Sequence, residues 1–183
     1  MKLAVFGDVH ANLEALTAVM ADAASCGVTD YACIGDVVGY GANPSECLSF
    51  VRGLDCPVVK GNHDADVSNG EELLKMNPVA RAALEWTRDQ LSAEELQWLG
   101  ALPLVELGGE SQPTFVHATL HHPEHWLYVF DRFDAEASMA RQTKELCFYG
   151  HTHQPRAFVS NGQAFPLMKE AGDIPIEPGK KYL

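Results

Sequence analysis

The sequence has few of the features that mark secreted or membrane proteins. Its five cysteines are odd in number and form no CxxC pair, which argues against a disulfide framework or a cysteine-type zinc site. The apolar run before Gly7 is too short for the core of a signal peptide. No apolar stretch approaches the ~20 residues that a membrane span needs. We therefore expect a protein of the reducing cytoplasm without a membrane segment.

Basic residues are also scarce. The chain has 13 Lys and Arg against 25 Asp and Glu, a formal net charge of -12. Such a charge repels a polyanion unless bound metals or a local basic patch reverse the field. Long nucleic acids are therefore poor candidate partners, whereas small phosphorylated molecules remain compatible with the composition.

The length and the balance of residue types are those of an ordinary globular protein. At 183 residues, with 46% apolar and 21% charged residues, the chain can bury a sizeable core and is long enough for one domain. We expect a single domain over residues 1–183 and one functional site.

The first sixty residues alternate between apolar runs and helical patterns. Strands are expected at Lys2–Phe6, Tyr31–Ile34 and Pro57–Lys60. A helical pattern runs from Leu13 to Ala23, and a second helix begins at Asn43-Pro44. This alternation predicts right-handed crossovers and a largely parallel sheet.

The rest of the chain mixes helices and short strands. Two helices are expected within Glu71–Leu102, with Trp86 and Trp98 in the core, and a third helix over Phe133–Thr143. Short strands are predicted at Leu104–Leu107, Thr114–Val116, Leu146–Tyr149 and Arg156–Val159, and Asn161-Gly162 predicts a turn into a strand at Gln163–Phe165.

Four polar motifs follow predicted strands. They are Gly7-Asp8-Val9-His10, Gly35-Asp36, Gly61-Asn62-His63-Asp64 and Gly150-His151-Thr152-His153. The carboxyl ends of strands in an open α/β sheet face one crevice, so these side chains should converge there. Each leading glycine lets the backbone turn sharply.

The residue types in these motifs indicate a metal site. Asp8 and His10 are two residues apart, as are His151 and His153, so each pair points the same way in an extended loop. Carboxylate and imidazole donors together favour a transition metal. Without cations, the crowded carboxylates would be costly, so metal should also stabilise the fold. One such motif alone would be an ordinary turn or cap; the four together are not.

These motifs resemble those of the calcineurin-like metallophosphoesterases. The resemblance runs from Met1 to about Val159 through GDVH, GDVVGYG, GNHD and GHTH. The segment Asp36–Pro44 and the later Phe115-Val116-His117 are most similar to the small bacterial and archaeal phosphodiesterase branch. The resemblance implies a four-layer α/β/β/α sandwich with two mixed sheets flanked by helices.

The resemblance also implies a ligand set for two divalent ions of Mn, Fe, Zn, Ni or Co. One ion would take Asp8, His10 and His153, the other would take Asn62, His117 and His151, and Asp36 would bridge both. Metals ~3.5–4 Å apart share a water and lower its pKa toward ~7, which supplies hydroxide for in-line attack on phosphorus.

Two further residues are implied in catalysis. His63 would protonate or stabilise the leaving oxygen, with Asp64 orienting its ring. His117 departs mildly from the pattern, because Ala118 stands where relatives often carry glycine. Its alternative is a buried histidine satisfied by its neighbours.

Some residues keep two interpretations. His121, His122 and His125, with Trp126 and Tyr128, form either a substrate wall or a solvated loop; their spacing slightly favours the loop. Tyr40 is a weaker candidate for substrate contact.

Relatives of this branch usually continue past a strand similar to Lys181-Tyr182-Leu183 into an Asn-Pro-Gly-Ser segment and further strands, whereas this chain stops at Leu183. A truncated product, a natural short form or completion by another subunit would each account for this. We expect an incomplete second sheet with an open edge and self-association through it.

The predicted function is metal-dependent hydrolysis of a small phosphate ester, a diester in preference to a monoester. The alternatives are a binding scaffold like the similar retromer subunit, which lacks the catalytic histidine, and a protein-phosphatase-like enzyme. The presence of His63 argues against the scaffold.

Overall fold

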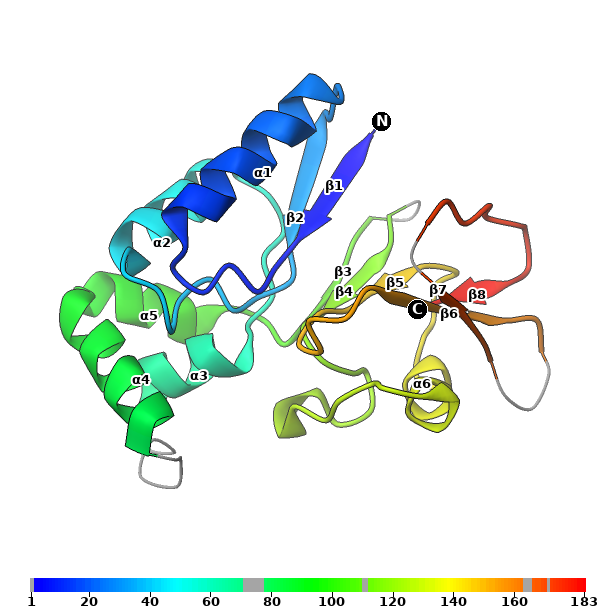
Figure 1. The fold of residues 1–183 in the computed structure, drawn as a ribbon. Coiled ribbons are helices and arrows are strands. Elements are labelled where there is room, and N and C mark those ends of the chain that lie inside the picture. The colour runs from blue at the N-terminus through cyan, green and yellow to red at the C-terminus, as the bar shows by residue number, and fades with distance from the viewer. Residues whose placement is uncertain (1, 71–77, 110–111, 163–165, 171) are drawn as a thin grey trace.

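The computed structural model describes residues 2–70, 78–109, 112–162, 166–170 and 172–183 (Figure 1). Strands β1 (Leu3–Phe6) and β2 (Asp30–Cys33) pair in parallel, with Leu3 opposite Asp30 and Phe6 opposite Cys33. Helices α1 (Leu13–Ser25) and α2 (Pro44–Gly53) cover the side of this pair that faces away from β3 and β4 (Figure 1). The parallel crossover expected from the sequence is confirmed.

The third expected strand, at Pro57–Lys60, is reduced to one parallel bridge between Cys33 and Val58. Two backbone hydrogen bonds support it, from Cys33 N to the Pro57 carbonyl (2.9 Å) and from Val59 N to the Cys33 carbonyl (3.0 Å). The ladder stops because the Lys60 amide donates to the Pro103 carbonyl instead, at 2.8 Å. Proline has no amide to extend the ladder at its other end.

Three helices follow: α3 (Asn62–Asn69), α4 (Pro78–Gln90) and α5 (Ala93–Ala101). The two helices expected within 71–102 are confirmed over the described residues 78–102, including the Ser92 to Glu95 capping box. Helix α3 was not expected, because its polar sequence shows no amphipathic period. The core position predicted for Trp86 is wrong, since that side chain is 43% exposed; Trp98 packs against the core.

The second half of the chain forms two small sheets. Strand β4 (Thr114–Val116) pairs antiparallel with β3 (Val105–Leu107) and parallel with β5 (Cys147–Phe148). Strand β6 (Arg156–Ser160) pairs antiparallel with β7 (Leu167–Glu170) and β8 (Lys181–Tyr182). Helix α6 (Arg132–Met139) and a short 3-10 turn, η2 (Pro123–His125), complete the elements.

The α/β fold class is confirmed, although the strands of the described residues divide into three short sheets instead of two. A parallel bridge between Leu146 and Tyr182 links the second and third sheets. The strand expected at Gln163–Phe165 lies outside the described residues. Among the described helices, none has the length and apolarity that a membrane span requires.

The first and second sheets pack on each other through a small apolar cluster. Ala32, Ile34 and Val59 on one side meet Phe115 on the other, and Leu3 and Val5 pack against them. Burying one aromatic or aliphatic side chain of this kind is worth roughly 1.5–3 kcal/mol. This contact brings the carboxyl ends of β1, β2, β4 and β5 to one crevice, which places the functional site.

Candidate metal centre

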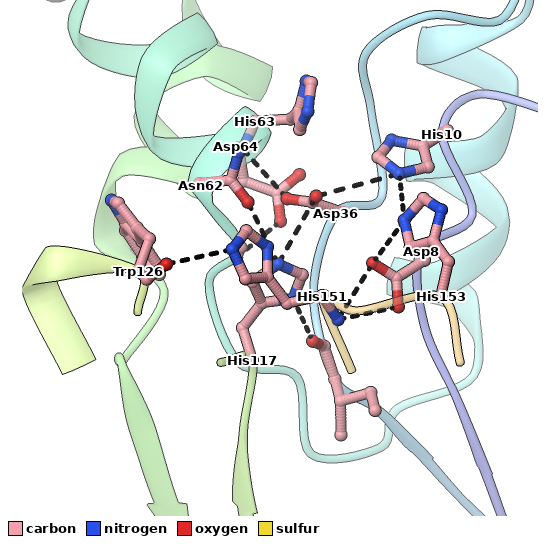
Figure 2. Close-up of polar contacts among 12 residues, drawn as sticks. Asp8, His10, Asp36, Asn62, His63, Asp64, His117, Trp126, His151 and His153 are labelled. Carbon is pink, nitrogen blue, oxygen red and sulfur yellow. Dashed lines mark hydrogen bonds and ion pairs between the residues drawn. The ribbon is translucent and has the colours of Figure 1, made fainter. Parts of the chain in front are cut away.

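The polar motifs meet at this crevice as the sequence predicts. Asp8 follows β1, Asp36 follows β2, His117 follows β4 and His151 follows β5, while Asn62 begins α3. Figure 2 shows their side chains pointing toward one another. A cavity of about 420 Å³ opens beside them, lined by His10, Asp36, Tyr40, Asn62, His63, Ala80, Tyr128, His151, Thr152 and His153.

The sharp turns lie mostly at the polar residues themselves. Five of them have positive φ: Asp8 (50°), His10 (48°), Asp36 (51°), His151 (66°) and His153 (52°). Such backbone conformations are sparsely populated for residues other than glycine and cost of order 1–3 kcal/mol each. The surrounding packing therefore holds these side chains in place against local strain.

At two of the motif glycines a carboxylate lies too close for a side chain to fit, and the backbone makes no unusual turn. A Cβ on Gly150 would lie 2.6 Å from Oδ2 of Asp8, and a Cβ on Gly61 would collide with the Asp36 carboxylate. Neither glycine has positive φ, whereas Gly35 does, at 91°. The expectation that each of the four glycines provides the turn therefore holds for Gly35, whereas Gly61 and Gly150 make room for carboxylates. Gly7 also lacks positive φ, and a Cβ there would lie 2.5 Å from Cγ1 of Ile34.

Asp8, His10 and His153 form the first cluster of donor atoms. Oδ1 of Asp8 lies 3.2 Å from Nε2 of His153, and Nε2 of His10 lies 3.3 Å from the same nitrogen. The Asp8 carboxylate also accepts a hydrogen bond from the His151 backbone amide at 3.2 Å.

Asp36, His117 and His151 form the second cluster, joined by Asn62. Nε2 of His117 lies 3.4 Å from Oδ2 of Asp36 and 3.1 Å from Oδ1 of Asn62. Oδ2 of Asp36 is also 3.8 Å from Nε2 of His10. Asp36 thus lies between the two clusters, in the place expected for a bridging ligand.

Burial and charge shift the titration of the central groups. Burial alone would raise the pKa of Asp36, but its hydrogen bond and charge interaction with His117 hold it below the usual value. Burial would likewise lower the pKa of His117, but the Asp36 carboxylate outweighs it and raises that pKa to about 9. The pKa of His151 falls to about 4 through burial and the neighbouring His117.

The donor set fits divalent metal ions. Two ligands at about 2.0–2.1 Å from a tetrahedral ion lie roughly 3.3–3.4 Å apart. Three distances in the crevice are similar: 3.3 Å from His10 Nε2 to His153 Nε2, 3.2 Å from Asp8 Oδ1 to the same nitrogen, and 3.4 Å from Asp36 Oδ2 to His117 Nε2. Nδ1 of His10 is buried without a hydrogen-bond partner.

The backbone orients two of the imidazoles for such a role. Nδ1 of His117 lies 2.8 Å from the Ile34 carbonyl, and Nε2 of His151 lies 3.0 Å from the Trp126 carbonyl (Figure 2). A carbonyl only accepts, so each bonded nitrogen carries a proton and the other nitrogen of each ring is left for a metal ion. Outer-shell bonds of this kind are typical of metal-binding histidines.

His63 and Asp64 are both buried beside the clusters but have different surroundings. The His63 ring lines the cavity, 4.4 Å from the Tyr40 ring and 4.9 Å from the His10 ring between centroids. Its Nδ1 has no hydrogen-bond partner, and burial lowers its pKa. In Figure 2 the ring points away from Asp36, while the His63 backbone amide donates to that carboxylate at 2.9 Å.

Asp64 does not orient the His63 ring as the resemblance implied. Its carboxylate accepts hydrogen bonds from the backbone amides of Val37 (3.0 Å), Val38 (3.2 Å) and Gly61 (3.0 Å). Burial, together with the Asp36 charge, raises the pKa of Asp64 to about 7. Asp64 therefore ties the loop after Asp36 to the start of α3.

Two residues that the sequence left open contact the centre. The Tyr128 ring stacks on His151, with 4.1 Å between centroids, and the Trp126 carbonyl binds the same histidine. No motif surrounds them, so only their aromatic character marked them in advance. His121, His122 and His125 are not among the residues that line the 420 Å³ cavity.

A domain model described as the calcineurin-like phosphoesterase superfamily domain matches residues 1–179. The chain belongs to this superfamily. It is 39% identical to an uncharacterized protein of Methanocaldococcus jannaschii, over 99% of this chain and 73% of that protein.

Solved structures agree with this assignment. The metallophosphoesterase from Sphaerobacter thermophilus is similar with a TM-score of 0.80 and 37% identity, over 100% of this chain and 74% of that one. A hypothetical protein from Pyrococcus horikoshii OT3 shares the fold, with a TM-score of 0.73 and 19% identity, over 84% of this chain and 70% of the other. The calcineurin-like phosphoesterases hydrolyse phosphate esters with divalent metal ions, and the two clusters are candidate ligands here.

Proposed function

We propose that this protein is a dinuclear phosphodiesterase that hydrolyses a small phosphate diester. The observation that carries the proposal is the position of Asp36 between two groups of donors, Asp8, His10 and His153 on one side and Asn62, His117 and His151 on the other. Six side chains around one shared carboxylate suit a pair of divalent transition-metal ions. When bound, such ions supply Lewis acidity that activates water and offsets charge on the phosphoryl oxygens.

His63 is suited to act on the leaving group. Its imidazole lines the cavity, whereas its Nδ1 is buried without a hydrogen-bond partner, so we assign the contact with an ester oxygen to the other ring nitrogen, Nε2. A ring held there can donate a hydrogen bond or a proton as the ester bond breaks, which contributes ~10²–10⁴-fold in typical cases. The Asp36 bond to the His63 amide fixes the backbone that carries the ring.

The charge around the cavity favours a diester over a monoester. Of the described residues that line it, none is lysine or arginine. A monoester dianion needs more positive groups than a diester monoanion, because each additional charge must be offset in the site. Tyr40 and Tyr128, 57% and 49% exposed at the cavity, offer surfaces for a second ester substituent.

We propose that the protein works in the cytoplasm. All five cysteines are free thiols, and Cys33, Cys47 and Cys147 are buried. Unpaired cysteines are typical of a reducing compartment.

The test compares bis(p-nitrophenyl) phosphate with p-nitrophenyl phosphate for the metal-loaded wild type and for His63→Ala. We expect a higher kcat/KM on the diester for the wild type. For His63→Ala we expect about 10²-fold lower kcat with unchanged bound metal, and a larger loss on an alkyl ester than on an aryl ester, because a poor leaving group depends more on the acid.

His121→Ala serves as the matched control, since that histidine does not line the cavity, and its activity should equal the wild type. A faster reaction on the monoester would contradict the diester preference. If the metal-loaded protein hydrolysed neither ester, the scaffold interpretation would replace the enzymatic one.

A further inference from the structure

The histidines of this chain are confined to two places. Five of the eight, His10, His63, His117, His151 and His153, lie in the crevice, and the other three are His121, His122 and His125. The second group is therefore a short segment with three imidazole side chains that lie outside the cavity of the candidate active site. Its chemistry is not used by the proposed reaction.

Three side chains of this segment converge on one another. Nδ1 of His122 lies 3.4 Å from Oε1 of Glu124, and Nε2 of His125 lies 3.9 Å from the same oxygen. One donor atom from each residue lies within 4.8 Å of the other two. The rings of His122 and His125 stack with 5.4 Å between centroids and 21° between planes.

The backbone of the segment is a tight turn that brings the three residues together. His122 and Trp126, on either side of η2, have positive φ of 55° and 53°. The His125 amide donates to the His122 carbonyl at 2.9 Å. Pro123 limits φ at the first position of the turn. The three donors are thus already close, so little ordering is needed to bring them onto one ion.

We propose that His122, Glu124 and His125 bind a transition-metal ion at the surface, separate from the ions of the crevice. Two imidazoles and one carboxylate suit Zn²⁺, Cu²⁺, Ni²⁺ or Co²⁺, whereas Mg²⁺ and Ca²⁺ prefer all-oxygen sets. Ligands of a tetrahedral ion lie roughly 3.3–3.4 Å apart, so the 3.4 Å contact fits as it stands and the 3.9 Å contact requires a small side-chain movement.

An ordinary surface ion pair accounts less well for this arrangement. A pair needs one imidazole near the carboxylate and contributes about 0–1 kcal/mol when exposed. Here two imidazoles approach the same oxygen, and their rings stack on one turn. A divalent ion uses all three donors at once, because it binds neutral imidazoles together with the carboxylate.

The position of the site suggests what the ion would affect. Glu124 lines a cavity of about 700 Å³ together with Asn62, Trp126 and His151. Trp126, which ends the turn, holds His151 through its carbonyl at 3.0 Å. An ion on the turn would therefore fix the segment that orients one ligand of the candidate metal centre.

The side chains are accessible enough for ions to exchange with solvent. Those of His122, Glu124 and His125 are 52%, 51% and 62% exposed. Three protein ligands leave a coordination position for water, as in open zinc sites. We expect weaker binding here than in the crevice, where donors are buried and more numerous.

The test is zinc binding by equilibrium dialysis with metal analysis, on chelator-stripped wild type, His122→Ala/His125→Ala and Glu124→Gln. We expect the double variant to bind one zinc ion fewer per chain than the wild type, and Glu124→Gln to bind the same ion at least tenfold more weakly. The matched control is His121→Ala, which removes a neighbouring imidazole outside the three donors and should retain the wild-type number of ions.

Equal zinc content in the wild type and the double variant would overturn the proposal, as would an equal loss in His121→Ala. Because the substituted side chains are largely exposed, the metal-free variants should unfold at the wild-type temperature. The readout is a difference between variants, so it stands whether or not the crevice binds two ions or hydrolyses an ester.

Discussion

Asp36 contacts residues of both donor clusters in the crevice. It is 1% exposed, and its two oxygens reach the His63 amide, the His117 ring and the His10 ring. A buried carboxylate with these contacts holds both clusters at a set separation. In the dinuclear site that we propose, this position would let Asp36 bind both ions.

Tyr40 is the side chain best placed to contact a substituent of the substrate. Its ring is 57% exposed and lies 4.4 Å from the His63 ring and 4.8 Å from the His10 ring. For Tyr40→Ala we expect KM for bis(p-nitrophenyl) phosphate to rise about tenfold, because stacking on an aromatic group is worth roughly 0.5–1.5 kcal/mol.

Tyr40→Phe keeps the ring and should retain the wild-type KM. An equal rise in KM for a dialkyl ester would contradict the stacking role, since that substrate has no ring to stack. Steady-state kinetics on both esters therefore separates aromatic recognition from a general disturbance of the cavity.

Helix α3 connects the two clusters through its first turn. Asn62 contributes its side chain to the second cluster, the His63 amide donates to Asp36, and Asp64 accepts amides from the loop after Asp36. The approach of this turn to Asp36 depends on Gly61, which has no side chain to separate them.

We therefore expect Gly61→Ala to abolish tight metal binding, because the new Cβ would collide with the Asp36 carboxylate and with its backbone amide. Gly53→Ala is the matched control, since a Cβ there meets nothing within 4 Å and the residue is helical. Metal content after dialysis is the measurement; retention of metal by Gly61→Ala would show that α3 can shift without loss of the site.

For the whole chain, bound metal should be a source of stability. At a free metal concentration of about 100 times Kd, binding to the folded state adds ~2.7 kcal/mol, which raises Tm by roughly 5–10 °C in a protein of this size. Calorimetry before and after chelation, with metal removal verified by analysis, measures the change. An unchanged Tm would contradict the expected coupling of metal binding to folding.

We also propose that copies of the chain associate through the outer edge of β7. Among the described strands, β7 pairs with β6 and with no other, and its Leu167 and Met168 are 53% and 55% exposed. An open edge with apolar side chains is a ready surface for pairing. Light scattering should show a mass that rises with concentration, and Met168→Lys should keep the protein monomeric.

A wild-type mass that stays monomeric at high concentration would rule out this association. The control variant is Val79→Lys, which adds the same charge at an 81% exposed position on α4, and which should associate like the wild type.

The family, the fold class and the positions of the polar motifs were predictable from the sequence. The motifs are local: a glycine, a carboxylate and an imidazole at strand ends carry their chemistry in a few residues. Helix α3 was missed because its first residues are polar groups that bind in the crevice, so its sequence lacks an amphipathic period. The strand at 57–60 was overestimated because Lys60 bonds to Pro103, which is distant in sequence.

The amino-acid sequence thus specified which donor side chains the protein has. It also specified that they meet at the carboxyl ends of the strands, because strands joined by right-handed crossovers place those ends at one edge of a sheet. Other properties depended on packing between distant segments. Asp64 binds amides and not the His63 ring, the Trp126 carbonyl orients His151, and His122, Glu124 and His125 gather on one turn. These contacts arise from burial and backbone direction, which no short motif encodes.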